Sequence, residues 1–212
     1  MKEPFYKLDE EKRRRVEESA LEEFGHYGYD RGSTDRIIRR SGISKGGLYE
    51  YIESKEALFI HVVARSFGAL YDHIGSRLRA RGVTDADPLI LVRAASEAAL
   101  DFYLDNPAVV RLIASLGTIA DPEVRRRSEG ISRERFSGLF ADADFSSVAI
   151  PPDAAIDLLA WMLVKTRNDF IAELETPDDR DKIRSAYLAD WDFILSVLAN
   201  GMYRKRGSQC SD

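Results

Sequence analysis

The sequence contains one cysteine, Cys210, close to its C-terminal end. A single thiol forms neither a disulfide within the chain nor a cysteine-based zinc site, so both kinds of covalent or metal cross-link are excluded. No stretch approaches the ~18 uninterrupted apolar residues of a membrane span. The first residues, Met1 to Phe5, also lack the apolar segment of a signal peptide. We therefore expect a soluble, cytoplasmic protein that does not enter a membrane.

Positive charge is also scarce, because the net charge of the 212 residues is -5. This argues against a protein that coats nucleic acid or anionic membranes nonspecifically, but it leaves room for a local basic patch. Apolar residues make up 44% of the chain, which is enough for a sizeable core and argues against disorder. The length fits one domain, or one domain with a small appendage.

Alternating apolar and polar runs between hairpin turns are absent, so we do not expect β-strands. Most prolines after residue 80 follow a residue that can cap a helix, which indicates a series of helix starts. These pairs are Asp87-Pro88, Asn106-Pro107, Asp121-Pro122 and Thr176-Pro177, with Pro151-Pro152 as a looser version. Helical periodicity follows them, and Asn200-Gly201 is a typical helix end. We predict an all-α protein of about nine helices.

Residues 33–51 predict two short helices that meet at a tight turn. The first covers 34–41, and Gly42 after it can adopt the positive φ that such a turn needs. Ile43 lies between the helices, where it can pack against Ile37 and Leu48. The pattern is that of a helix-turn-helix, whose second helix places its N-terminal residues in the major groove of DNA.

The start of the second helix carries residue types that suit DNA. Ser44 can cap this helix so that backbone N–H groups face a phosphate, and Lys45 adds positive charge. Gly46 and Gly47 together cost roughly 2 kcal/mol of helix propensity, and close approach to another surface is one reason to accept that cost. Residues 31–55 hold six cations and three anions, a net charge of +3. A solvated helical hairpin would explain this modest charge equally well.

Enzymatic interpretations fit the same residues less well. Gly42 to Gly46 match G-x-S-x-G, but a nucleophile elbow needs a strand before the serine, and a helix is predicted there. Glu23 and His26 have the spacing of half of a di-iron motif, whose second half is missing. No glycine-rich phosphate loop is found. We predict a protein that is not an enzyme, with no catalytic residues, metal or cofactor.

A set of residues between Ala20 and Leu58 has the order and spacing of a known family. These residues are Phe24, Gly28, Tyr29, Thr34, Ile37, Gly42, Ile43, Ser44, Lys45, Gly46, Leu48, Tyr49, Tyr51 and Ser54 to Leu58. In them the chain resembles the TetR family of transcriptional regulators. The resemblance implies a DNA-binding domain over 1–55 and a ligand-binding and dimerisation domain over 56–203. The composition of residues 204–212 predicts a frayed polar tail. The resemblance also implies a repressor that a small-molecule inducer releases from its double-stranded DNA operator.

The resemblance further implies which residues contact DNA. Thr34, Tyr49 and Lys55 would hold phosphates, whereas Lys45 would read bases. Gly47 stands where threonine is common and so removes one contact. The full set of expected contacts is Thr34, Ser44, Lys45, Gly46, Tyr49, Tyr51 and Lys55.

The helix predicted after Pro152 carries two polar residues, Arg167 and Asn168, in otherwise apolar rows. We interpret these side chains as part of a ligand cavity lined by aromatic residues. The candidate ligand-binding residues are Phe102, Tyr103, Phe136, Trp161, Arg167 and Asn168. A boundary arginine that reaches solvent, together with an asparagine at a helix interface, is the alternative.

The last two predicted helices are long and apolar and are separated by a polar loop at 175–181. Paired across a twofold axis, they would form a four-helix interface between two copies of the chain. Packing within one chain fits the periodicity equally well, and the resemblance favours the homodimer. A helical ligand-binding or enzymatic dimer without operator binding is the competing hypothesis.

Overall fold

The computed structural model describes residues 1–83, 86–174 and 180–202, and within these ranges it is all-α. It contains ten α-helices and one short 3-10 helix, so the predicted fold class is confirmed. The predicted helix start at Thr176-Pro177 lies outside the described residues. None of the helices within these ranges is long and apolar enough to cross a membrane.

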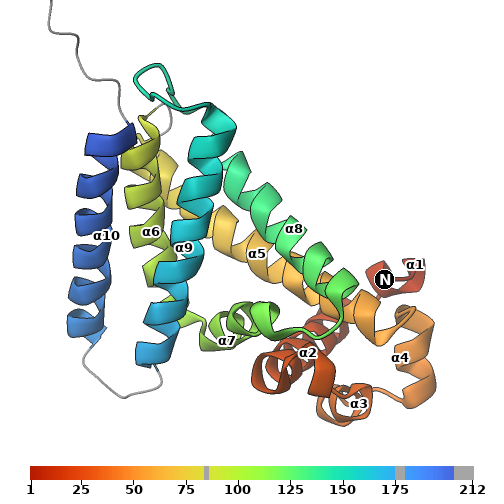
Figure 1. Ribbon diagram of the computed structural model, residues 1–212. Coiled ribbons are helices and arrows are strands. Elements are labelled where there is room, and N and C mark those ends of the chain that lie inside the picture. Colours follow the sequence, from red (N-terminus) through yellow and green to blue (C-terminus); the bar gives the residue numbers. More distant parts are fainter. Residues whose placement is uncertain (84–85, 175–179, 203–212) are drawn as a thin grey trace, which may run out of the picture. The chain divides into compact units, whose positions relative to one another are not determined.

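The chain divides into two compact units (Figure 1). The first consists of Met1–Asp72 and Phe102–Arg135, and the second of His73–Asp101 and Phe136–Asp212. Each unit therefore combines segments that are distant in the sequence. The boundary that we expected after residue 55 falls inside the first unit, at the start of a long helix, and the functional division into two domains stays a prediction.

The first unit is built around α2, which packs against α3 and α7. Its helices are α1 (Glu3–Tyr6), α2 (Glu10–Arg31), α3 (Thr34–Ser41), α4 (Lys45–Tyr51), α7 (Pro107–Ser115) and the 3-10 helix η1 (Leu116–Thr118). Phe24 and Phe59 meet edge to face in the core, with ring centroids 5.0 Å apart. Ile37 and Leu48, both fully buried, attach α3 and α4 to this core.

Three helices continue from one unit into the other: α5 (Lys55–Ala80), α6 (Pro88–Asp105) and α8 (Pro122–Gly138). The second unit adds α9 (Pro152–Leu174) and α10 (Arg180–Met202), which pack against each other. Phe170 of α9 and Tyr187 of α10 lie with ring centroids 5.1 Å apart. Leu159 of α9 and Trp191 of α10 are fully buried.

Proline marks the first residue of α6, α7, α8 and α9, as the sequence predicted. Asp87 and Asp121 accept backbone hydrogen bonds in the first turns of α6 and α8. Asn106 does not cap α7, because its side-chain amide donates to the carbonyl of Phe102 and so closes α6 instead. This predicted cap was therefore wrong, although the helix start was correct.

The predicted end of the last helix at Asn200-Gly201 is also wrong, since α10 runs on to Met202. Asn200 donates its side-chain amide to the carbonyl of Ser196 and keeps a helical conformation. Gly28, in contrast, has a φ of 68° and kinks α2. A left-handed conformation of this kind is accessible to glycine at little cost.

Candidate nucleic-acid interface

The helices α3 and α4 meet at Gly42, whose φ of 71° makes the tight turn. Ser44 then caps α4 by accepting the backbone N–H of Gly47 at 3.0 Å. The first backbone N–H groups of a helix have no partner within the helix, so the start of α4 is positively polarised. The turn and the cap that the sequence predicted are both present in the structure.

Two of the expected phosphate-contacting residues lie together on this surface. The hydroxyl groups of Thr34 and Tyr49 are 3.3 Å apart and share a hydrogen bond between α3 and α4. Lys45 forms an ion pair with Asp35, 3.2 Å away, in which both side chains are exposed. An exposed pair of this kind contributes little to stability, so Lys45 can exchange Asp35 for a DNA group at small cost.

The two glycines of α4 differ in their surroundings. A Cβ atom added to Gly46 would meet nothing within 4 Å, whereas one added to Gly47 would lie 3.0 Å from the Ser44 hydroxyl. The tight cap therefore explains Gly47. The fold does not require glycine at position 46, where the backbone faces open space in the first turn of the helix.

The short helix α1, which the sequence did not predict, braces α4 from the other side. The backbone N–H of Lys2 donates to the carbonyl of Tyr51, and the Lys2 ammonium donates to the carbonyl of Tyr49. Phe5 is completely buried beneath this segment. Lys12 of α2 lies over the Tyr51 ring, 5.7 Å from its centroid. The position of Tyr51 is thus fixed by two other helices.

Glu23 is a buried carboxylate that holds α3 against α2. The residue is 1% exposed. One oxygen accepts the backbone N–H of Ser33 and the Nε–H of Arg36, each at 2.8 Å. The hydrogen bond with Glu23 raises the pKa of Arg36. Because Ser33 precedes α3 directly, this carboxylate fixes where the helix-turn-helix begins.

The sequence did not reveal this role, since Glu23 was noticed only as a partner of His26 in half of a metal motif. Arg36 also donates to the carbonyl of Arg31 and stacks over the Tyr27 ring, 4.2 Å from its centroid. The available signal was an acid within the apolar stripe that contains Ala20 and Phe24. Such a residue is buried with a partner when its helix packs on both sides.

The Lys55 ammonium, which we expected to hold a phosphate, instead contacts backbone carbonyls at the end of α2. It donates to the carbonyl of Tyr29 at 2.9 Å and lies 3.4 Å from the carbonyls of Asp30 and Gly32. It also lies over the Tyr29 ring, 4.5 Å from the centroid. Lysine often satisfies the last carbonyls of a helix in this way. Lys55 therefore caps α2, and its phosphate contact stays a prediction.

Lys55→Ala should lower the free energy of unfolding by about 1 kcal/mol, because carbonyl groups at the end of α2 lose their donor. The slope of DNA affinity against salt should also fall by about one unit if the ammonium holds a phosphate. Denaturant unfolding and binding titrations at several salt concentrations measure both effects. Lys165→Ala, an exposed lysine paired with Asp169, is the control that should change neither. An unchanged slope would limit Lys55 to helix capping.

The candidate ligand residues are divided between the two units and differ in burial. Phe102 and Tyr103 are buried in the first unit, whereas Phe136 and Arg167 are buried in the second. Trp161 is 67% exposed. Asn168 is also exposed. The two rows of α9 that contain Arg167 and Asn168 therefore face different ways: Arg167 is buried, whereas Trp161 and Asn168 are exposed.

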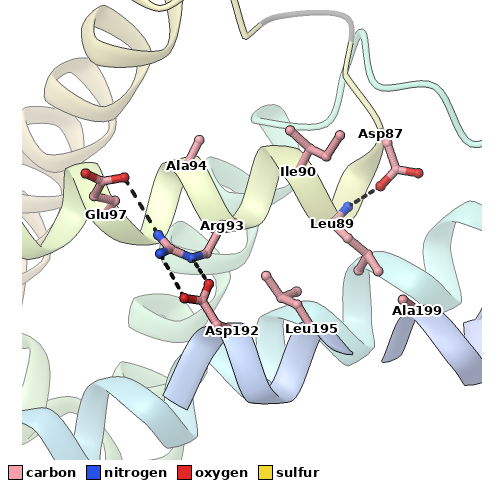
Figure 2. Close-up of a pocket in the computed structure, with 9 residues that line it drawn as sticks. All are labelled: Asp87, Leu89, Ile90, Arg93, Ala94, Glu97, Asp192, Leu195 and Ala199. Atoms are coloured by element: carbon pink, nitrogen blue, oxygen red, sulfur yellow. Dashed lines mark hydrogen bonds and ion pairs between the residues drawn. The ribbon is translucent and has the colours of Figure 1, made fainter. Parts of the chain in front are cut away.

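A groove of about 720 Å³ lies on the second unit between α6 and α10 (Figure 2). Arg93 of α6 forms an ion pair with Asp192 of α10 across the groove and another with Glu97 on its own helix. A hydrogen bond from Arg81 lowers the pKa of Glu97. The groove residues are Asp87, Leu89, Ile90, Arg93, Ala94, Glu97, Asp192, Leu195 and Ala199. None of the candidate ligand residues is among them, and the main charges of its walls are already neutralised.

An all-α fold with a capped helix-turn-helix near its start is typical of bacterial DNA-binding regulators. Residues 18–62 match the family described as bacterial regulatory proteins, tetR family. The helix-turn-helix segment of the chain therefore belongs to the TetR family. This match covers the whole helix-turn-helix and agrees with the resemblance seen in the sequence.

Curated relatives match about half of the chain. The HTH-type transcriptional activator FasR of Mycolicibacterium smegmatis is 32% identical over 115 residues, which cover 54% of this chain and 51% of FasR. The nucleoid occlusion factor SlmA of Haemophilus ducreyi is 26% identical over 118 residues, which cover 53% of this chain and 56% of SlmA. The chain thus spans about half the length of the curated relatives that it matches.

Solved structures resemble nearly the whole chain. A TetR family transcriptional regulator from Chloroflexus aurantiacus has a TM-score of 0.61 at 22% identity, covering 96% of this chain and 99% of its own. The regulator FadR from Bacillus subtilis, crystallised with stearoyl-CoA, has a TM-score of 0.67 at 13% identity, covering 90% and 99%. These likenesses extend the shared fold into the second unit.

Proposed function

We propose that this protein is a homodimeric DNA-binding transcription regulator, a repressor that a small-molecule inducer releases from its operator. The observation that carries the proposal is the exposed start of α4. It combines a serine-capped helix end, a lysine with a weak partner, and a glycine that the fold does not require. These features suit a helix end that approaches another molecule closely.

The contacts to DNA would divide into two kinds. Lys45, at the first position of α4, would reach base edges in the major groove. Thr34 and Tyr49, whose hydroxyls share a hydrogen bond, would hold one phosphate from both sides. Ser44, Gly46 and Tyr51 would position the backbone. The hydrogen bonds of Glu23 and the contacts between the N-terminal segment and α4 would keep this surface rigid without touching DNA.

A second copy of the chain would cover the exposed apolar face of α9 and α10. Trp161 and Val164 of α9 are exposed, and Phe193 and Val197 of α10 are exposed as well. An apolar stripe on two neighbouring helices is typical of an interface that forms a four-helix arrangement. The dimer would present two copies of α4 to half-sites about one helical turn apart.

Release of DNA would follow from linkage between the two sites. A ligand that binds better to a conformation with misplaced reading helices lowers the operator affinity by the same free energy. The candidate sensor residues are Phe102, Tyr103, Phe136 and Arg167, with Trp161 and Asn168 assigned instead to the exposed face of α9. FadR carries stearoyl-CoA in the same fold, which supports a ligand in the helical part of this protein.

Gly46→Ala tests the proposal, because stability and DNA binding should change in opposite directions. Alanine should stabilise the protein by about 0.5–1 kcal/mol, since it favours the helix and its methyl group meets nothing within 4 Å. The same methyl group would stand where the backbone approaches DNA, so operator affinity should fall at least about tenfold. Denaturant unfolding and gel shifts on the DNA upstream of the gene measure the two effects.

Gly130→Ala in α8 is the matched control, because a Cβ atom there also meets nothing within 4 Å. This variant should gain stability and keep its DNA affinity. Equal DNA affinity of Gly46→Ala and the wild type would mean that α4 does not approach DNA at this residue. Absence of specific binding by the wild type would favour a helical ligand-binding dimer without an operator.

A further inference from the structure

Arg167 of α9 is a buried cation without a counter-charge. The residue is 8% exposed. Its Nε–H is buried and has no hydrogen-bond partner. Across the described residues, no ion pair or hydrogen bond of Arg167 is found. A charged group is rarely buried in this way unless an opposite charge or an acceptor satisfies it. The buried Nε–H of Arg167 therefore lacks the acceptor that such a group normally has.

The acids that lie next to Arg167 and Trp191 in the sequence form ion pairs with other cations. Asp169 of α9 pairs with Lys165, and Asp192 of α10 pairs with Arg93. Arg184 of α10, unlike Arg167, is held by both Asp101 and Glu97 of α6. The second unit thus neutralises its other inward-facing arginines with its own carboxylates. Arg167 differs because no carboxylate of the described residues is assigned to it.

A second donor without a partner lies close to the same level of the helix pair. Trp191 of α10 is completely buried, and its indole N–H has no hydrogen-bond partner. Arg167 precedes Phe170 by three residues, and Trp191 follows Tyr187 by four. Because α9 and α10 are antiparallel, both steps run the same way from the Phe170–Tyr187 contact, by about 4.5 Å and 6 Å. Arg167 and Trp191 therefore lie about one turn beyond this aromatic contact.

We propose that Arg167 and Trp191 bind an organic anion, and that this anion is the regulatory ligand. An oxyanion can accept from the guanidinium and the indole N–H together, which satisfies both buried donors at once. An apolar body on the ligand would pack beside Phe170 and Tyr187. Carboxylates and phosphate esters both fit this site, since a guanidinium binds either group in the same fork geometry. Its regulatory role rests on the proposed function, whereas its binding does not.

The stability of the ligand-free protein tests the uncompensated charge. Arg167→Met should raise the melting temperature by about 3 °C, because it replaces a buried charge without a partner by an apolar side chain of similar length. Arg184→Met is the matched control on α10, and it should lower the melting temperature because it leaves Asp101 and Glu97 without their cation. The proposal would be overturned if Arg167→Met lowered the melting temperature as much as Arg184→Met does.

Binding is measured with phenylacetate, phenyl phosphate and the uncharged phenylacetamide at constant ionic strength, by calorimetry and by melting temperature. At least one anion should raise the melting temperature of the wild type by about 3 °C at saturation, and the amide should not. The stronger anion identifies the head group. Arg167→Met should lose this response, and Arg167→Lys should retain part of it. An equal effect of the amide, or an undiminished response in Arg167→Met, would contradict the anion site.

Measuring operator binding distinguishes a failure of the anion site from a failure of the proposed DNA-binding function. Arg167→Met should bind operator DNA as the wild type does, but the anion should no longer release it. Operator binding with no anion response in the wild type would overturn the anion site and leave the DNA-binding proposal standing. An anion response in a protein without operator affinity would support the site and overturn the proposed regulation.

Discussion

Glu23→Ala is expected to lower the free energy of unfolding by about 2–4 kcal/mol, since it leaves buried donors without an acceptor. The backbone N–H of Ser33 and the guanidinium of Arg36 both lose their shared acceptor. Because Ser33 precedes α3 directly, the helix-turn-helix should lose its fixed position on α2. Specific DNA binding should then disappear, even at temperatures where the remaining protein stays folded. Denaturant unfolding followed by circular dichroism, together with gel shifts, measures both losses.

Two control variants separate the hydrogen bonds of Glu23 from a general effect of charge. Glu22→Ala removes a neighbouring acid that is half exposed and pairs with Arg111 at 3.4 Å. Its stability should change by less than about 0.5 kcal/mol, as for most surface pairs. Glu23→Gln keeps an acceptor for Ser33 and should fall between the wild type and Glu23→Ala. If Glu22→Ala and Glu23→Ala lower the free energy of unfolding equally, the hydrogen bonds of Glu23 do not hold the helix-turn-helix on α2.

The second large effect is expected from a charged pair of substitutions, Trp161→Asp with Phe193→Asp. These side chains are 67% and 70% exposed on α9 and α10, so the single chain should tolerate the change. A dimer interface would not, because carboxylates would be buried without partners between two copies. The variant should be monomeric in sedimentation and should bind operator at least about 100-fold more weakly, since each half-site is then bound alone.

Ile90→Asp is the matched control, because Ile90 is 58% exposed on α6 and does not belong to the α9–α10 stripe. This variant should remain a dimer with wild-type DNA affinity. A dimeric Trp161→Asp/Phe193→Asp protein would place the interface elsewhere. A monomeric variant with full operator affinity would show that dimerisation and DNA binding are independent.

The local features of the helix-turn-helix could be predicted from the sequence because they depend on neighbouring residues. Gly42 at the turn and Ser44 at the cap act within a few positions of themselves, and the structure has both. Prolines that start helices are equally local, which explains the correct starts of α6 to α9. Asn106 was the exception, because its side chain could bond either forward or backward along the chain.

Contacts between distant residues could not be predicted in this way. Glu23, Lys55 and α1 all act on segments that the sequence gives no reason to place beside them. Periodicity also marked two rows on α9 without telling which row faces inward. Burial assigns Arg167 to the inner row and Trp161 to the outer one, which separates the candidate ligand site from the candidate interface.

The affinity of the wild-type protein for its own operator tests the central claim most directly. The measurement is a titration of the DNA upstream of the gene and of a shuffled sequence of equal length and composition, at two salt concentrations. A specific reader should bind the natural sequence at least about 1,000-fold more tightly, with affinity for both falling as salt rises. Equal affinity for the two sequences would contradict the claim that α4 reads an operator.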